Sequence, residues 1–327
     1  MLEEIIPDLY RIEIPLPNNP LKWLNCYIVK GGVRFLIIDT GFNREECLNA
    51  MHDGLRRLGV DLNKADFFIT HLHADHIGLL SRVASDSSKI YFNELEARRT
   101  YTLLPNRRQH WEKMLAVYIA NGFDESTARN SMASHPAHKF GLQRAMEFSV
   151  IKDGDTIEFG NFKFRCIVTP GHSPGHTCLY EAEKKILVAG DHILFDITPN
   201  ITYWEEMEDS LGNYLASLEK VSSLDVALVL PGHRRLVHDL RGRVKELQEH
   251  HRARLNEVMT ALGDGEKNIL QTAPRISWDI TAKTWDAFPP AQKWFAFGET
   301  YAHVNYLVGQ GKVRRKNQNG KITYALV

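Results

Sequence analysis

The chain has 327 residues, a length that suits one large or two ordinary domains, and its hydrophobic fraction of 43% suits a packed core. Its 40 Lys and Arg residues are balanced by 40 Asp and Glu residues. This balance excludes a global attraction to nucleic acid or to an anionic membrane, but it is compatible with a local basic patch.

The amino-terminal part of the chain predicts strands followed by a helix. Alternation of apolar and polar residues, and a Gly31-Gly32 turn between two apolar runs, are typical of strands and of a hairpin. The predicted strands cover residues 9–14, 26–30 and 34–38. A helix is predicted over residues 45–58, closed by Gly59. With one more strand, this order supplies half of a layered sandwich.

The next strand, residues 66–70, ends in a short loop of metal-binding side chains. The loop reads His71-Leu72-His73-Ala74-Asp75-His76. His71 and His73 are two apart, so in an extended segment they point the same way, while Asp75 and His76 follow a turn and could face a second ion. Three imidazoles and a carboxylate within six residues favour a metal site over surface or core histidines.

A helical stretch, residues 93–146, interrupts the strand pattern and is broken at Pro105. Its apolar stripe indicates a packing face against the sandwich, a lid that selects a substrate with an apolar part, or a homodimer contact. The stripe consists of Trp111, Met114, Leu115, Tyr118 and Ile119. A basic cluster in the same stretch could meet phosphate or carboxylate groups, although such clusters are more often solvated. The cluster consists of Arg98, Arg99, Arg107 and Arg108.

Three later strands end in the same way, in Gly- or Pro-containing loops that carry Asp or His. Residues 164–168 precede His172 and His176, residues 185–189 precede Asp191 and His192, and residues 225–229 precede His233. The strand at 34–38 leads likewise to Asp39. Polar side chains gathered at strand ends predict the rim of an active site.

The carboxy-terminal part changes character after His233, so we predict a catalytic domain at 1–238 and a second domain at 239–327. Helices are predicted over 239–262, 267–272 and 291–309, and a terminal hairpin over 312–315 and 322–326. Three helices and a hairpin are typical of a winged helix. Its basic wing could track phosphates, or the hairpin could only dock on the sandwich.

Taken together, the five motifs resemble those of the metallo-β-lactamase-fold hydrolases over roughly residues 1–240. The resemblance implies an α/β fold, an αββα sandwich with two metals in a groove at one edge. It assigns His71, His73 and His172 to one metal. It assigns Asp75, His76 and His233 to the other, with Asp191 bridging both. The tail resembles, more weakly, the winged-helix domain of the LACTB2-like branch, which points to cleavage of single-stranded RNA.

This centre predicts two divalent ions, zinc first, with iron or manganese as alternatives, and a metal-bridging hydroxide as nucleophile. Asp39 and His176 are expected to orient the ligands, or His176 faces solvent. Asp75 and His192 are the catalytic candidates. His192 donates a proton, polarises a carbonyl, or only packs beyond the metals. Tyr203 is a candidate for substrate binding.

The predicted function is metal-dependent hydrolysis of an ester, thioester or lactone bond of a small molecule. The alternatives are an endoribonuclease or phosphodiesterase acting on single-stranded RNA, an oxygen-using mononuclear iron enzyme, and a non-catalytic nucleic-acid-binding protein. Fold alone does not decide among these. The chain shows no secretory signal and no apolar run of membrane length. Its four cysteines lack CxxC spacing, which predicts reduced core thiols in a cytoplasmic protein. No membrane partner is expected.

Overall fold

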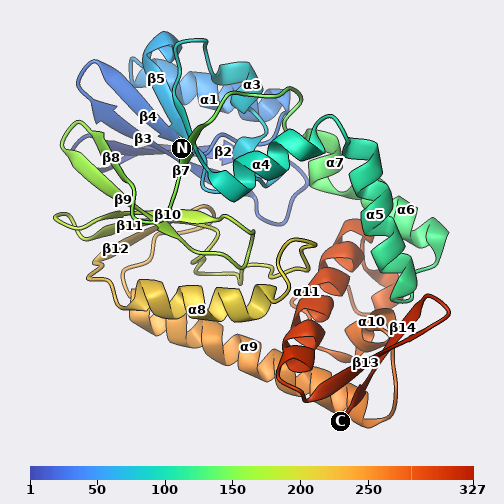
Figure 1. Cartoon of the computed structure of the whole chain (residues 1–327). Helices are drawn as coiled ribbons and strands as arrows, with labels where there is room; N and C mark the ends of the chain where they lie inside the picture. Colours follow the sequence, from blue (N-terminus) through green and yellow to red (C-terminus); the bar gives the residue numbers. More distant parts are fainter. Residues whose placement is uncertain (281) are drawn as a thin grey trace.

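Two β-sheets face each other in the computed structural model, which describes residues 1–280 and 282–327, and helices cover both outer faces (Figure 1). The first sheet has the order β1-β2-β3-β4-β5-β6-β7, with bounds Leu2–Ile6, Leu9–Pro15, Trp23–Gly31, Arg34–Ile38, Ala65–Phe68, Ile90–Asn93 and Ser149–Ile151. The second has the order β12-β11-β10-β9-β8, with β8 to β12 at Thr156–Phe159, Phe162–Val168, Thr177–Glu181, Ile186–Gly190 and Leu228–Pro231. The expected αββα sandwich is confirmed.

Alternation along the strands divides the core into layers. On β3, Tyr27 and Val29 are buried between the two sheets, whereas Cys26 and Ile28 are buried under the helices of the first sheet. Successive strand side chains point to opposite faces, so a strand buried on both faces must be apolar throughout. A third apolar cluster lies between the second sheet and its helices.

Strand direction gathers the chemically active loops at one edge of the sandwich. β4 and β5 run parallel, so both end on the same side. β9 and β11 each pair antiparallel with β10 and therefore run in the same direction as each other, and β12 is parallel to β11. The loops after these five strands carry all of the Asp and His residues singled out at strand ends.

The outer helices pack through apolar stripes. On α1 (Glu45–Arg57), Cys47, Met51 and Leu55 recur at four-residue spacing and are buried against the first sheet. Short helices α2 (Ala74–Ile77) and α3 (Leu80–Val83) follow the histidine loop. The second sheet is covered by α8 (Ser210–Ser222) and α9 (Leu240–Gly263) (Figure 1).

The helical insertion is confirmed, but its packing partner is not the one expected. It forms α4 (Glu94–Leu103), α5 (Arg107–Ala120), α6 (Glu125–Ser134) and α7 (Pro136–Phe140), and Pro105 lies between the first two. Tyr118 stacks on Trp294 and Phe297 of α11 (Pro290–Gly309), with ring centroids 3.8 and 4.2 Å apart. Packing of the stripe against the sandwich is therefore wrong, and so is including Ile119, which is 38% exposed. The homodimer contact stays a prediction.

The carboxy-terminal part follows the predicted order of helices and hairpin. After α9 come α10 (Ile269–Thr272), α11, β13 (Val313–Gln318) and β14 (Lys321–Leu326), with short 3-10 turns at Ala273–Arg275 and Trp285–Ala287. Tyr324 of β14 donates a hydrogen bond to Asn121 Oδ1 at 3.0 Å. The backbone of Tyr324 also forms an antiparallel β-bridge with Lys267. The hairpin therefore packs on the helices rather than on the sandwich. The domain boundary at 238/239 stays a prediction.

Several sequence boundaries differ from the structure for local reasons. The strand predicted at 225–229 begins at Leu228, where it gains its parallel partner Ile186 on β11. Strands β1, β6, β7, β8 and β10 and helix α8 were not predicted. Short strands depend on their neighbours more than on their own pattern. All four cysteines are buried as free thiols. Among the described residues, no helix combines the length and apolar character needed to span a bilayer.

Candidate metal centre

Seven predicted ligands meet at the edge of the sandwich in three overlapping groups. Within each group, one nitrogen or carboxylate oxygen of every residue lies within 4.8 Å of the others. The groups are His71, His73 and His172; His71, His76 and Asp191; and Asp75, His76 and His233. All seven side chains are buried except that of His73, which is partly exposed. Four separate parts of the chain thus deliver donors to one small volume.

The first group consists of imidazoles only. His71 Nε2 lies 2.9 Å from His73 Nδ1 and 3.2 Å from His172 Nε2. Burial, and after it the neighbouring imidazoles, holds the pKa values of His71 and His73 well below the usual range. Neutral rings keep the lone pairs that a metal requires.

The other two groups each combine a carboxylate with imidazoles. His233 Nε2 lies 3.3 Å from Asp75 Oδ2 and 3.5 Å from Asp191 Oδ1. The other Asp191 oxygen, Oδ2, lies 3.6 Å from His172 Nε2, so the carboxylate of Asp191 faces His172 on one side and His233 on the other. Burial alone would raise the pKa of Asp191, but His233 and His76 hold that pKa well below its usual value.

Three polar atoms at the centre lie close to one another without forming a hydrogen bond. His76 Nε2, Asp191 Oδ1 and His233 Nε2 are buried and make no hydrogen bond to any described residue. Leaving such atoms unpaired costs about 1–3 kcal/mol each. Imidazole nitrogen with carboxylate oxygen is a donor set that divalent zinc accepts. The seven residues therefore fit divalent metal.

The outward nitrogens of the ligand rings are fixed by acceptors. Asp39 Oδ2 lies 2.7 Å from His76 Nδ1, while Asp39 Oδ1 accepts a hydrogen bond from the Thr70 amide at 2.9 Å. His172 Nδ1 lies 2.8 Å from Asn200 O, and His233 Nδ1 lies 2.8 Å from Trp23 O. Because a carbonyl only accepts, Nδ1 carries the proton in both rings and Nε2 is left for a metal.

Two backbone features let these groups come so close. Asp39 has φ of 59°, the left-handed region that non-glycine residues seldom adopt, and its carboxylate thereby reaches the histidine loop. At Gly232, an added Cβ would lie 2.5 Å from Asp191 Oδ1 and 2.9 Å from His76 Cε1. Any larger residue at 232 would push into the centre.

His176 lies immediately behind the ligands. Its ring is fully buried, so the solvent-facing alternative is wrong. Nδ1 lies 2.8 Å from Thr169 Oγ1, and Nε2 accepts the backbone N–H of Asp191 at 3.2 Å. His176 therefore hydrogen-bonds to the backbone of Asp191, and its ring lies 5.1 Å, between centroids, from the ring of the ligand His71.

His192 is buried beyond the ligands, with its ring 5.3 Å from that of Tyr214. Neither ring nitrogen has a hydrogen-bond partner among the described residues, and burial lowers its pKa to about 3. A neutral ring in this position suits packing better than proton donation. The catalytic roles of His192 and of Asp75, which lies among the ligands, stay predictions.

The aromatic residue beside the ligands is Trp204 rather than Tyr203. Tyr203 stacks on Tyr301 in the helical core, with centroids 4.6 Å apart. Trp204 lies nearly parallel to the ring of His73, with centroids 5.8 Å apart, and its Nε1 donates to His172 O at 3.1 Å. Two adjacent aromatic residues in a loop cannot be distinguished from sequence.

A buried glutamate of the insertion was also missed. Glu96 Oε1 accepts hydrogen bonds from Ser173 Oγ at 2.7 Å and from the Gly175 amide at 2.6 Å. Its Oε2 accepts from the Leu72 amide at 2.9 Å. Glu96 thereby joins the histidine loop to the loop of His172.

Of the four arginines in the basic cluster, one approaches the centre. Arg99 is 8% exposed, its guanidinium lies 4.8 Å from the ring of Trp204, and it forms an ion pair with Glu206. Arg107 donates to Leu142 O, while Arg98 and Arg108 are exposed.

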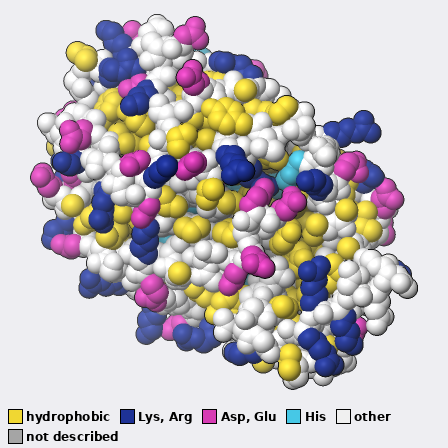
Figure 2. Space-filling model, in the orientation of Figure 1, with side chains coloured by type: hydrophobic (Ala, Val, Ile, Leu, Met, Phe, Trp, Pro, Cys, Tyr) yellow, Lys and Arg dark blue, Asp and Glu magenta, His cyan; other side chains and the backbone are white. Residues whose placement is uncertain are grey.

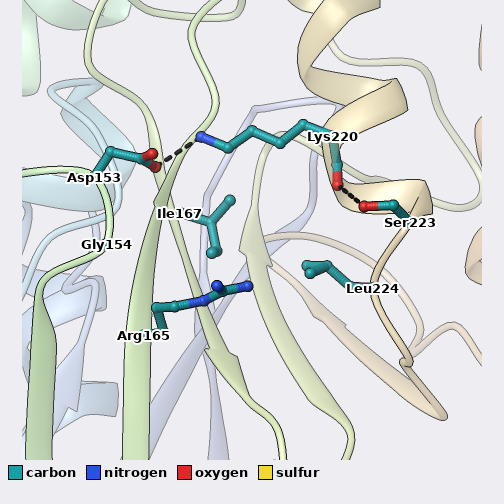
Figure 3. Close-up of a pocket in the computed structure, with 7 residues that line it drawn as sticks. All are labelled: Asp153, Gly154, Arg165, Ile167, Lys220, Ser223 and Leu224. Atoms are coloured by element: carbon teal, nitrogen blue, oxygen red, sulfur yellow. Dashed lines mark hydrogen bonds and ion pairs between the residues drawn. The ribbon is translucent and has the colours of Figure 1, made fainter.

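A surface hollow elsewhere on the second sheet carries no comparable chemistry. It measures about 150 Å³ and is lined by Asp153, Gly154, Arg165, Ile167, Lys220, Ser223 and Leu224 (Figure 3). Lys220 Nζ lies 2.7 Å from Asp153 Oδ1, so two of the three charged side chains that line it pair with each other. Figure 2 shows basic and acidic side chains interspersed over one face, with little histidine surface.

Comparison with known sequences agrees with this geometry. The sequence model of the Metallo-beta-lactamase superfamily matches residues 24–233, which include all seven predicted ligands. A probable metallo-hydrolase of Bacillus subtilis is 25% identical over 309 residues, 92% of each chain. The human acyl-coenzyme A thioesterase MBLAC2 is 27% identical over 219 residues, 64% of this chain and 72% of the relative.

Solved structures extend the similarity to the helical parts. A metallo-beta-lactamase family protein of Thermus thermophilus superposes with a TM-score of 0.82 at 26% identity, covering 99% of this chain and 100% of that one. A beta-lactamase domain protein of Burkholderia ambifaria gives 0.80 at 23% identity, over 100% and 95%. The family match covers well over half of the sequence and includes every loop that carries a predicted ligand. The chain therefore belongs to the metallo-beta-lactamase superfamily.

Proposed function

We propose that the chain is a hydrolase that uses two divalent metal ions to cleave an ester or thioester bond of a small molecule, and that zinc is the preferred ion. One observation carries the proposal. The donor atoms of seven side chains, six of them buried, converge from separate loops, and three of the polar atoms among them have no hydrogen-bond partner in the described structure. A folded chain is expected to keep such a cluster only if ions satisfy it.

The distances between the donor atoms support assigning the ligands to two ions. His71, His73 and His172 would hold one ion, and Asp75, His76 and His233 the other, with the two oxygens of Asp191 directed to both sides. When bound, a pair of divalent ions supplies an acidified water and polarises the oxygen under attack. No side-chain nucleophile is needed, which agrees with the burial of all four cysteines.

Two observations support a thioester or ester substrate. The human relative MBLAC2 is named as an acyl-coenzyme A thioesterase. Next to the ligands, the indole of Trp204 adds an apolar surface beside His73, the ligand that is partly exposed. An acyl chain would pack on such a surface while its carbonyl faces the metals.

Ribonuclease activity is the second candidate, supported by the tail. Lys312, Arg314 and Arg315 are exposed on or next to β13, as the basic wing of a winged helix would require. Two observations oppose this candidate. Lys316 pairs with Glu266, and Tyr324 of the hairpin is buried. A purely nucleic-acid-binding protein is opposed by the intact donor set.

A side-by-side assay separates these candidates. Acyl-coenzyme A, ester, lactone, phosphodiester and single-stranded RNA substrates would be offered to the same zinc-loaded preparation. We expect thioester or ester cleavage that is lost with Asp191→Ala and unchanged in the double variant Arg314→Ala/Arg315→Ala. Cleavage of RNA alone, lost in the double variant, would contradict the proposal and favour the ribonuclease.

A further inference from the structure

The ligand His172 is held from the loop after β11 at two points. Its Nδ1 donates to Asn200 O at 2.8 Å, and its backbone oxygen accepts from Trp204 Nε1 at 3.1 Å. The first contact decides the tautomer and thereby leaves Nε2 free to face the centre. The orientation of His172 thus depends on how firmly Asn200 is fixed.

Asn200 is fixed by the carboxy-terminal helix α11. Its side-chain amide donates to Glu299 Oε2 at 2.9 Å and approaches Phe295 O at 3.5 Å. Glu299 lies 99 residues further along the chain and 66 residues beyond His233, outside the stretch that matches the superfamily. A residue of the tail therefore stands two contacts away from a predicted ligand.

Glu299 is itself held rigidly. It is 7% exposed, and its Oε1 lies 3.9 Å from Arg254 Nη2 on α9. Arg254 is 6% exposed and lies 4.3 Å from the ring of Trp278. A buried carboxylate with one oxygen toward a cation and the other toward an amide has little freedom to turn. The chain Arg254–Glu299–Asn200–His172 is continuous and mostly buried.

We propose that Glu299 is a positioning residue for the metal centre: by holding Asn200, it keeps His172 in the orientation that binds the first ion. The carboxy-terminal helices then form part of the support of the centre and are more than an attached module. This inference rests on the proposed metal-dependent function, but its test reads metal affinity rather than substrate turnover. A packing role alone would stabilise the fold and leave metal affinity unchanged.

The test uses four single variants of the full chain and the double variant Glu299→Leu/Asn200→Ala. Glu299→Leu removes the acceptor, Asn200→Ala removes the donor but keeps the carbonyl, and Glu299→Gln keeps an acceptor oxygen. Val304→Ala is the matched control, because Val304 is fully buried on the same helix in the apolar cluster shared with the insertion. Zinc affinity is measured by competition with a chromogenic chelator, and stability by thermal unfolding of the metal-free chains.

We expect one zinc ion to bind about tenfold more weakly in Glu299→Leu and in Asn200→Ala, the range found for residues that orient ligands. The double variant Glu299→Leu/Asn200→Ala should bind zinc no more weakly than either single variant, because both substitutions break the same contact. Glu299→Gln should stay within about threefold of the wild type, and Val304→Ala should lose stability but not affinity.

Wild-type zinc affinity in Asn200→Ala would overturn the proposal, even if Glu299→Leu fails to fold. So would a loss of affinity in Val304→Ala that matches its loss of stability, because the tail would then act only through folding. Failure of the proposed function appears separately, as a wild-type chain that binds two zinc ions yet cleaves no ester or thioester.

Discussion

The loops at the edge of the sandwich and the helices beside them contribute to the centre in opposite ways. Each ligand loop directly follows a strand and carries its donors close to the end of that strand, as His71 and His73 do after β5. The helices contribute single residues, Glu96 from α4 and Glu299 from α11, whose partners lie 24 to 99 residues away in sequence. Ligands are therefore encoded locally, whereas their support depends on the tertiary fold.

The largest expected effect lies in the loops. Replacing Asp191 with Ala removes the carboxylate that faces both groups and should reduce hydrolysis by at least about a thousandfold, roughly 4 kcal/mol in the activation barrier. His73→Ala should have a similar effect. Metal content and turnover would be measured on the same preparation. Substantial turnover by a metal-free Asp191→Ala chain would break the assignment of chemistry to the loops.

The helices should show the reverse behaviour. Tyr118→Ala removes a ring stacked on Trp294 and Phe297 and should lower the free energy of unfolding by about 3–5 kcal/mol. The zinc affinity of the chains that stay folded should not change, because Tyr118 touches neither Asn200 nor a predicted ligand. Denaturant unfolding and chelator competition would measure the two quantities. A tenfold loss of zinc affinity would show that the two regions are not separable in this way.

Glu96 lies where the two regions meet. Glu96→Ala leaves the amides of Leu72 and Gly175 and the hydroxyl of Ser173 without their buried acceptor, which should cost about 3 kcal/mol of stability. Activity should fall as well, because both ligand loops lose their common anchor. Glu96→Gln, which retains one acceptor oxygen, is the control and should lose less. Equal stability of Glu96→Ala and the wild type would remove this link between helix and loops.

Trp204 should give the smallest effect. Trp204→Ala removes both the ring beside His73 and the hydrogen bond to His172 O, and we expect KM to rise about tenfold, near 1.4 kcal/mol. Trp204→Phe keeps an aromatic surface but not the hydrogen bond, so comparing the two variants separates packing from positioning. Steady-state kinetics on an acyl thioester would measure both. An unchanged KM in Trp204→Ala would mean that the substrate lies elsewhere.

The same contrast explains what the sequence could predict. The separate strands, the helical insertion and the Asp and His residues at strand ends follow from local sequence patterns, whereas the αββα sandwich and the assignment of the ligands to two metals follow from the resemblance to the metallo-β-lactamase fold. Trp204 in place of Tyr203, and the packing of Tyr118 on α11 instead of the sandwich, depend on how loops and helices meet. Nothing in the spacing of Glu96 or Glu299 distinguishes them from solvated glutamates. Their burial exists only after folding.

One measurement tests the central claim most directly. The chain would be stripped of metal with a chelator, shown to be folded by circular dichroism, and titrated with zinc while hydrolysis and bound metal are followed together. We expect no hydrolysis before zinc is added and a rise that saturates at about two ions per chain. Full hydrolysis by the folded metal-free chain, or saturation at one ion with full activity, would contradict a two-metal hydrolytic centre.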